Sequence, residues 1–109
     1  MGTLVSLNRG ATAATLTVDT DIDDQTRPAV EAAVAGLPGT VRDLTLDLDA
    51  VRFVDSAVLY LILTARDSFG PEGGRLHVAG LGAQPRRLLV LATDLWPEAR
   101  WEDYLPAAG

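Results

Sequence analysis

The feature that most constrains the fold is a helix-like apolar segment that directly follows a strand-like segment. The residues from Leu44 to Leu48 alternate between apolar and polar, and the strand-like run continues to Val54. This alternation is typical of a β-strand with one buried face. From Ala57 to Phe69 the chain is apolar almost all round, which indicates a helix that lies mostly inside the protein. A strand joined in this way to a buried helix favours an α/β fold.

The remaining segments predict the order β-β-α-β-α-β-α-β and a single domain over residues 1–109. We expect strands at Leu4–Leu7 and Ala13–Val18, followed by a helix with Pro28 in its first turn, an apolar stripe from Ala29 to Leu37, and a stop at Gly36 and Pro38-Gly39. Further along we expect a strand at Leu76–Ala79, a helix opened by Pro85 with Leu88, Leu89, Leu91 and Ala92 on its inner side, and a last short strand at Trp101–Leu105. A turn is expected at Gly70–Gly74 and a frayed end at Pro106–Gly109. A hairpin followed by β-α-β units predicts a mixed sheet of four to five strands with helices packed on it.

Composition excludes several kinds of chemistry. The chain has no cysteine, one histidine and nine basic residues, all of which are arginines. A disulfide framework and a histidine-based metal cluster are therefore excluded. The missing lysine also excludes a P-loop and Schiff-base catalysis. We expect no cofactor and no metal.

The net charge of −6 disfavours nucleic acid as a direct partner, because phosphate neutralisation needs a basic patch. The same charge favours partners with basic surfaces. The longest apolar run, Ala57 to Leu63, is too short to span a membrane, and no secretory signal opens the chain. We therefore expect a cytoplasmic protein without membrane insertion.

Asp55 and Ser56 stand between the predicted strand and the predicted buried helix. Aspartate and serine are common helix N-caps, and an N-cap contributes about 1 kcal/mol. A serine hydroxyl at this position would also face unpaired backbone N–H groups and the positive end of the helix dipole, where a phosphate is favoured. The residues alone leave open whether this pair caps the helix or carries a phosphate.

The sequence resembles a STAS domain of the anti-sigma factor antagonist type from about Ala13 to Trp101. The resemblance is carried by Leu46-Asp47-Leu48-Asp49, Val51-Arg52-Phe53-Val54-Asp55-Ser56, Gly73-Gly74-Arg75-Leu76-His77-Val78-Ala79-Gly80-Leu81 and Arg86-Arg87-Leu88-Leu89. Members place a phosphorylatable serine after an aspartate, in the motif Asp-Ser-Ser/Thr-Gly. This chain departs from that motif at Ala57 and Val58. Asp23 matches the aspartate of the family's Gly-Glu-Leu-Asp segment.

The resemblance implies a regulatory binding module and no enzymatic activity. Its partner would be an anti-sigma factor, which in this family is often a serine kinase, and the capture of that partner would release a sigma factor and so regulate transcription. Ser56 would be the phosphoacceptor, and a serine phosphatase would reverse the modification. The implied partner-binding residues are Asp23, Asp55, Ser56, Ala57 and Val58. The alternative is a STAS scaffold that is not phosphorylated and serves a sensor or a lipid-transport complex.

Other constellations are weaker. Ser56, His77 and an aspartate could form a catalytic triad, but the chain has no Gly-x-Ser-x-Gly elbow. The set Asp19, Asp21, Asp23 and Asp24 could hold a cation, although its spacing does not match an EF-hand and we favour a helix cap with a solvated acidic edge.

A receiver domain would need the lysine that this chain lacks. Trp96 and Trp101 are expected to be core or rim aromatics.

Overall fold

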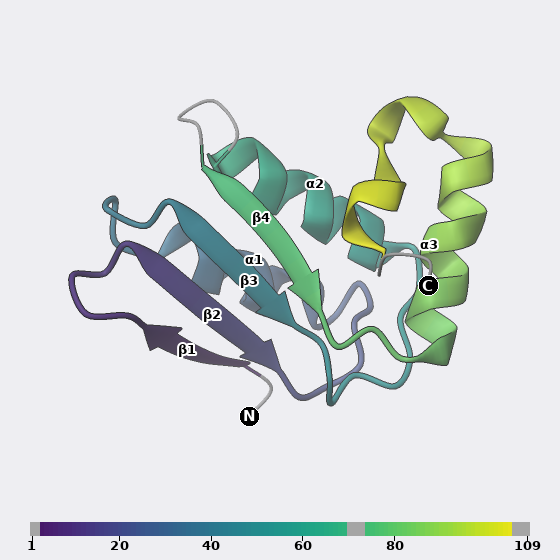
Figure 1. Ribbon diagram of the computed structural model, residues 1–109. Coiled ribbons are helices and arrows are strands. Elements are labelled where there is room, and N and C mark those ends of the chain that lie inside the picture. The colour runs from purple at the N-terminus through teal and green to yellow at the C-terminus, as the bar shows by residue number, and fades with distance from the viewer. Residues whose placement is uncertain (1–2, 70–73, 106–109) are drawn as a thin grey trace.

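The computed structural model describes residues 3–69 and 74–105. A four-stranded sheet with the strand order β1-β2-β3-β4 forms its centre (Figure 1). The strands are β1 (Thr3–Leu7), β2 (Ala13–Val18), β3 (Asp43–Asp47) and β4 (Arg75–Ala79). β1 runs antiparallel to β2, whereas β2, β3 and β4 are parallel. The predicted mixed sheet and the predicted α/β class are therefore confirmed.

Three helices accompany the sheet. α1 (Arg27–Ala35) and α2 (Ala57–Phe69) lie together on one face, and α3 (Ala83–Leu95) stands beyond the carboxyl end of β4 (Figure 1). Two short 3-10 helices, η2 (Pro97–Ala99) and η3 (Trp101–Tyr104), follow α3 and return the chain toward the sheet. In the part of the chain that the structure describes, no helix is long and apolar enough to cross a membrane.

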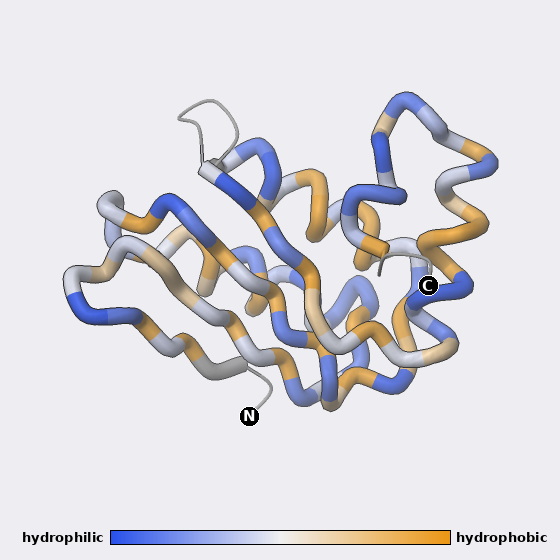
Figure 2. Tube along the Cα trace, viewed as in Figure 1, coloured by the Kyte–Doolittle hydropathy of each residue, from blue (hydrophilic) through white to orange (hydrophobic). Residues whose placement is uncertain are grey.

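The core lies between the sheet and helices α1 and α2. Along β2 and β3 every second side chain is buried, and Leu16 pairs with Leu46 in the parallel register. Figure 2 shows the matching alternation of hydrophobic and hydrophilic residues along the strands. Ile62 of α2 is 0% exposed, which confirms that this helix packs on the sheet as its sequence predicts. The helix is not buried all round, because Tyr60 is 58% exposed.

The strand predicted at Trp101–Leu105 is wrong, because residues Trp101–Tyr104 form the 3-10 helix η3. Trp101 and Tyr104 are both buried, and their spacing of three residues places them on the same side of a 3-10 turn. Arg66 secures this segment: its Nη1 donates a hydrogen bond to the Ala99 carbonyl oxygen at 2.6 Å, and its guanidinium lies 5.9 Å from the Trp101 ring centroid.

Two smaller expectations also change. Leu91, predicted on the inner side of α3, is 53% exposed, since Leu89 and Ala92 form the buried side. β3 ends at Asp47 because the chain turns there, with the Val51 N–H bonded to the Leu48 carbonyl oxygen at 2.9 Å. The expected turn at Gly70–Gly74 and the expected frayed end at Pro106–Gly109 fall outside the described residues, except for Gly74.

Candidate functional site

The chain before Ser56 is held from both sides by hydrogen bonds. On one side it meets the Ile22 backbone, which donates to the Phe53 carbonyl oxygen at 3.2 Å and accepts from the Asp55 N–H at 3.1 Å. On the other side the Gln84 side-chain amide bonds both backbone groups of Val54, its Oε1 accepting from the N–H and its Nε2 donating to the carbonyl, each at 2.9 Å. The Gln84 side chain thus makes the two backbone hydrogen bonds that a neighbouring strand would otherwise make to Val54, and in this way it positions the start of α2.

Asp55 caps α2. Its Oδ1 accepts a hydrogen bond from the Ala57 N–H at 2.8 Å, and its side chain is partly buried. Such a bond satisfies one of the backbone donors that a helix leaves unpaired at its start. The Ser56 side chain is exposed, and its hydroxyl makes no hydrogen bond to any residue within 3–69 or 74–105. The sequence offered a capping role to the pair as a whole; in the structure Asp55 makes the capping bond, and the Ser56 hydroxyl is left available at the surface.

Ala57 and Val58 point into the core. Their side chains are 1% and 2% exposed, so they offer no surface for a partner in this structure. The two positions at which the chain departs from the family motif are therefore packing positions here. That the backbone at these residues takes part in binding stays a prediction.

Asp23 lies in a loop joined to the Ser56 end of the molecule. Ile22 forms a parallel bridge with Val54, and the Asp21 Oδ1 accepts from the Phe53 N–H at 3.3 Å. Within the loop, the Asp23 Oδ1 accepts from the backbone N–H groups of Thr26 at 3.0 Å and of Gln25 at 2.9 Å. These bonds, led by that from Thr26, lower the pKa of Asp23 below its ordinary value of 3.8. Asp23 is thus a partly buried, ionised carboxylate that fixes the loop directly before α1.

An apolar groove of about 300 Å³ begins at Ser56 and was not predicted from the sequence. Its first wall is a helical stripe on α2, formed by Ser56, Leu59, Tyr60 and Leu63. Its second wall comes from the C-terminal turns and consists of Trp96, Glu98, Ala99 and Trp101. Trp96 and Tyr60 are both about half exposed, whereas Trp101 is buried. The first wall could have been found from the sequence, because residues 56, 59, 60 and 63 have the spacing of one helix face. The second wall could not, because it depends on the 3-10 turns that follow α3.

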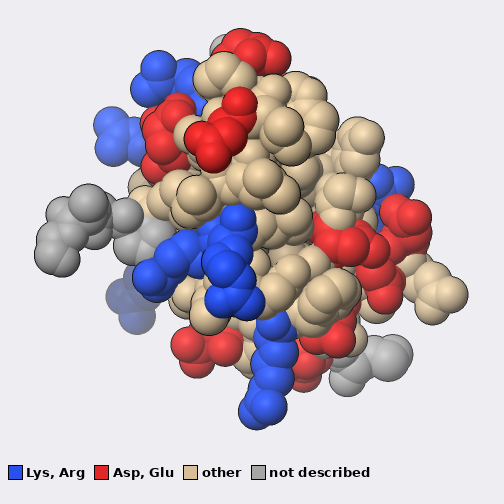
Figure 3. Space-filling view, turned by 90° about the vertical axis from the view of Figure 1, so that its right-hand side faces the viewer, with Lys and Arg blue, Asp and Glu red and all other residues tan. Residues whose placement is uncertain are grey.

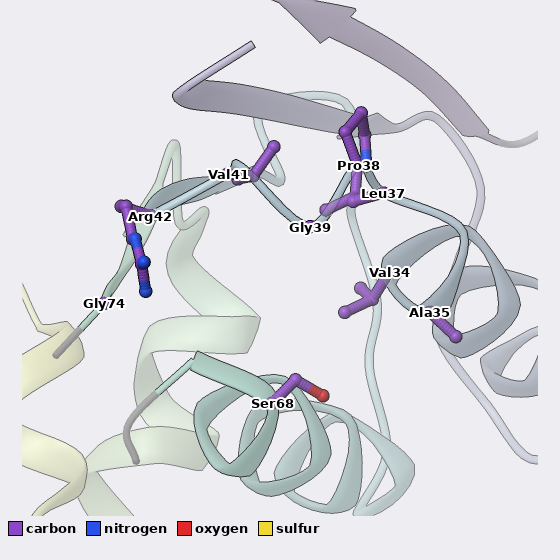
Figure 4. A pocket seen from close by; sticks show the side chains of 9 residues that line it. All are labelled: Val34, Ala35, Leu37, Pro38, Gly39, Val41, Arg42, Ser68 and Gly74. Carbon is purple, nitrogen blue, oxygen red and sulfur yellow. The ribbon is translucent and has the colours of Figure 1, made fainter. Parts of the chain in front are cut away.

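A second hollow lies at the other end of the parallel strands. It has a volume of about 190 Å³ and lies between the end of α1, the residues before β3 and the last turn of α2 (Figure 4). Val34, Val41 and Ser68 are among the residues that line it. None of the predicted site residues reaches it. Ligand sites in open α/β sheets lie at the carboxyl ends of the strands, and Ser56 follows that end of β3.

The alternative sites gain no support from the geometry. His77 lies on β4, where it pairs in register with Thr45 of β3, and it does not line the groove at Ser56. The groove therefore does not bring Ser56 and His77, two members of the hypothetical triad, together. Across residues 3–69 and 74–105, no group of three or more His, Asp or Glu side chains is arranged to hold a metal ion.

Comparison with known proteins assigns the family. The family model described as "Mlab, STAS domain" matches residues 5–93. The chain therefore belongs to the STAS family. No curated protein matches the sequence.

Solved structures agree with this assignment. An anti-sigma factor antagonist from Mycobacterium paratuberculosis is 27% identical with a TM-score of 0.72, and the match covers 96% of this chain and 85% of that one. The unphosphorylated anti-sigma factor antagonist SpoIIAA is 14% identical with a TM-score of 0.70, over 98% of this chain and 88% of that one. A STAS-domain anti-sigma factor antagonist from Rhodobacter sphaeroides is 15% identical with a TM-score of 0.59, over 72% and 85%. The last two similarities concern the fold alone.

Proposed function

We propose that the protein is an anti-sigma factor antagonist of the cytoplasm. It binds an anti-sigma factor that is itself a serine kinase, and this binding releases a sigma factor. The observation that carries the proposal is the exposed Ser56 hydroxyl at the start of α2, left free because Asp55 forms the cap. The similarity to the mycobacterial antagonist supports the same class of partner.

The proposed binding surface combines the Ser56 groove with the loop that contains Asp23. The groove offers the partner apolar and aromatic contacts from Leu59, Tyr60 and Trp96. Aromatic side chains are enriched in the parts of interfaces that carry most binding energy. Glu98 in the second wall of the groove and Asp23 in the loop joined to the Ser56 end are acidic, so the partner is expected to contribute arginine or lysine there.

Phosphorylation of Ser56 by the bound kinase would end the contact, and a serine phosphatase would restore it. A phosphoserine adds about two negative charges at neutral pH. The modified side chain would lie at the mouth of an apolar groove. Binding of the partner there would remove water from the charged phosphate, and this desolvation costs much free energy. At the same time the N-terminus of α2 would stabilise the phosphate. The modification should therefore weaken binding without unfolding the protein.

The test incubates the protein with ATP and its cognate anti-sigma kinase. The kinase is first identified by co-purification with the untagged chain. Mass spectrometry should find one phosphate on Ser56, and Ser56→Ala should abolish it. Ser56→Glu should weaken kinase binding at least tenfold in titration calorimetry while its urea unfolding midpoint stays at or slightly above that of the wild type. Ser68→Ala is the matched control, since Ser68 is an exposed serine of the same helix whose hydroxyl already donates to the Thr64 carbonyl oxygen. A phosphate on Ser68 or Thr64 would refute the assignment.

A second candidate function is a STAS scaffold that is never phosphorylated and serves a sensor or lipid-transport complex. The burial of Ala57 and Val58 favours it, because the second hydroxyl and the glycine of the family motif are replaced by core-packing side chains. The two functions differ in one measurement. A stable complex with a partner that neither phosphorylates Ser56 nor loses affinity for Ser56→Glu would support the scaffold.

A further inference from the structure

Helix α3 carries a continuous stripe of exposed side chains. Its buried side consists of Pro85, Leu89 and Ala92. The opposite side is exposed and consists of Arg86, Arg87, Val90, Leu91, Asp94 and Leu95, here called the α3 stripe. These positions recur at intervals of three and four residues, so they form one face of the helix. Val90, Leu91 and Leu95 are 47%, 53% and 58% exposed, which is unusual for three aliphatic residues on one short helix.

The charges of the α3 stripe are separated along the helix. Both arginines lie in the first half, Asp94 lies in the last turn, and Val90 and Leu91 lie between them. Figure 3, which looks onto the side of the molecule that carries α3, shows basic side chains in the middle of its lower half with uncharged surface above them, while other basic and acidic side chains surround this region. Within the part of the chain that the structure describes, Arg86, Arg87 and Asp94 form no ion pair. The stripe is therefore basic at one end, apolar in the middle and acidic at the other end.

We propose that the α3 stripe binds the same stripe of a second copy of this chain, with the two helices antiparallel. A two-fold axis between Val90 and Leu91 would place each Val90 against Leu91 of the second copy. The same axis would place each Arg87 against Asp94 of the second copy, so both ends of the stripe would meet the opposite charge. A parallel arrangement would instead bring arginine to arginine and aspartate to aspartate. The stripe is thus self-complementary in the way that a two-fold symmetric interface requires.

The expected dimer is weak and does not use the candidate functional site. α3 has 13 residues and is therefore about 20 Å long. A single pair of helices of this length buries less area than a standard stable interface, so we expect a dissociation constant of roughly 10 μM to 1 mM. The α3 stripe shares no residue with the groove at Ser56. The dimer is therefore independent of the proposed function.

The test is sedimentation equilibrium of the full chain between about 10 μM and 1 mM. The wild type should follow a monomer–dimer equilibrium. Arg87→Glu and Asp94→Arg should each weaken dimerisation about 10- to 100-fold, because either change turns two attractive pairs into two repulsive ones. An equimolar mixture of these two variants should form a heterodimer, since each new charge then meets its opposite. The double variant should regain the wild-type dimer. A parallel pairing would bring like charges together in the wild type and in every variant, so it would not show this loss in the single variants and recovery in the double variant.

Controls separate pairing from folding. Arg52→Glu makes the same charge change at an exposed arginine outside the stripe and should leave dimerisation unchanged. Circular dichroism should show native helix content in every variant. Two results would overturn the proposal: a wild type that stays monomeric at 1 mM, or a double variant that stays monomeric when the wild type dimerises. If the wild type is monomeric and Leu91→Glu loses binding to the anti-sigma kinase, the stripe belongs to that partner instead.

Discussion

Gln84 offers the sharpest test of how the fold positions Ser56. Its side chain makes two hydrogen bonds to the Val54 backbone across 30 residues of sequence, both at 2.9 Å. Val54 is 1% exposed, so water has little access to replace these bonds. A hydrogen bond within a protein contributes about 0.5–1.5 kcal/mol, and the loss of two gives an expected destabilisation of about 1–3 kcal/mol for Gln84→Ala.

Two measurements check this expectation. Urea unfolding gives the free energy of unfolding, and hydrogen exchange gives the protection of the Val54 amide. Gln84→Ala should lower both. Gln84→Glu keeps an acceptor for the Val54 N–H but loses the donor to its carbonyl, so it should lower stability while the Val54 amide stays protected. The Ala57 amide, which the Asp55 carboxylate holds, is an internal reference in the same spectra.

Gln25→Ala is the matched control variant, because Gln25 is exposed and its side chain makes no hydrogen bond within the described residues. Its free energy of unfolding should stay within about 0.5 kcal/mol of the wild type. If Gln84→Ala were equally harmless and left the exchange of the Val54 amide unchanged, the claim that Gln84 positions the start of α2 would be refuted.

Three further predictions concern the core and the Asp23 loop. Ile62→Ala should lower the free energy of unfolding by about 2–5 kcal/mol in urea titrations, because Ile62 is fully buried, and a variant as stable as the wild type would contradict the packing of α2. Val58→Gly should cost about 2–4 kcal/mol by the same assay, since it removes a buried side chain and adds a helix glycine; a loss below about 0.5 kcal/mol would contradict its burial. Because the folded-state pKa of Asp23 is lowered from 3.8, its stabilising contribution is present above that pH and is lost as the pH falls through the folded-state pKa. Asp23→Asn should therefore show a weaker loss of stability than the wild type between about pH 5 and pH 2 in thermal unfolding, and identical pH curves would count against this role.

Much of the fold could be predicted from local patterns. The alternation in β2 and β3 follows from a sheet with one buried face, and the extent of α2 was predicted from the predominance of apolar residues between Ala57 and Phe69. The family resemblance rested on short stretches between Leu46 and Leu89, strongest around Asp55–Ser56, and the family model and the solved structures confirm it. The segment after α3 was predicted wrongly because Trp101 and Tyr104 are buried by contacts with distant residues, and a run of five residues is too short for a reliable periodicity.

The sequence by itself determined the class of fold, the burial of α2 and the place of Ser56 at its start, because each depends on the order of residues within one or two neighbouring elements. The tertiary structure alone decided which of Asp55 and Ser56 caps the helix, that Val58 faces the core, and that Gln84 holds Val54. It also decided that the C-terminal turns, secured by Arg66, close one side of the groove at Ser56. These features depend on side-chain directions and on contacts between segments some 30 residues apart, and no local period in a sequence records such contacts.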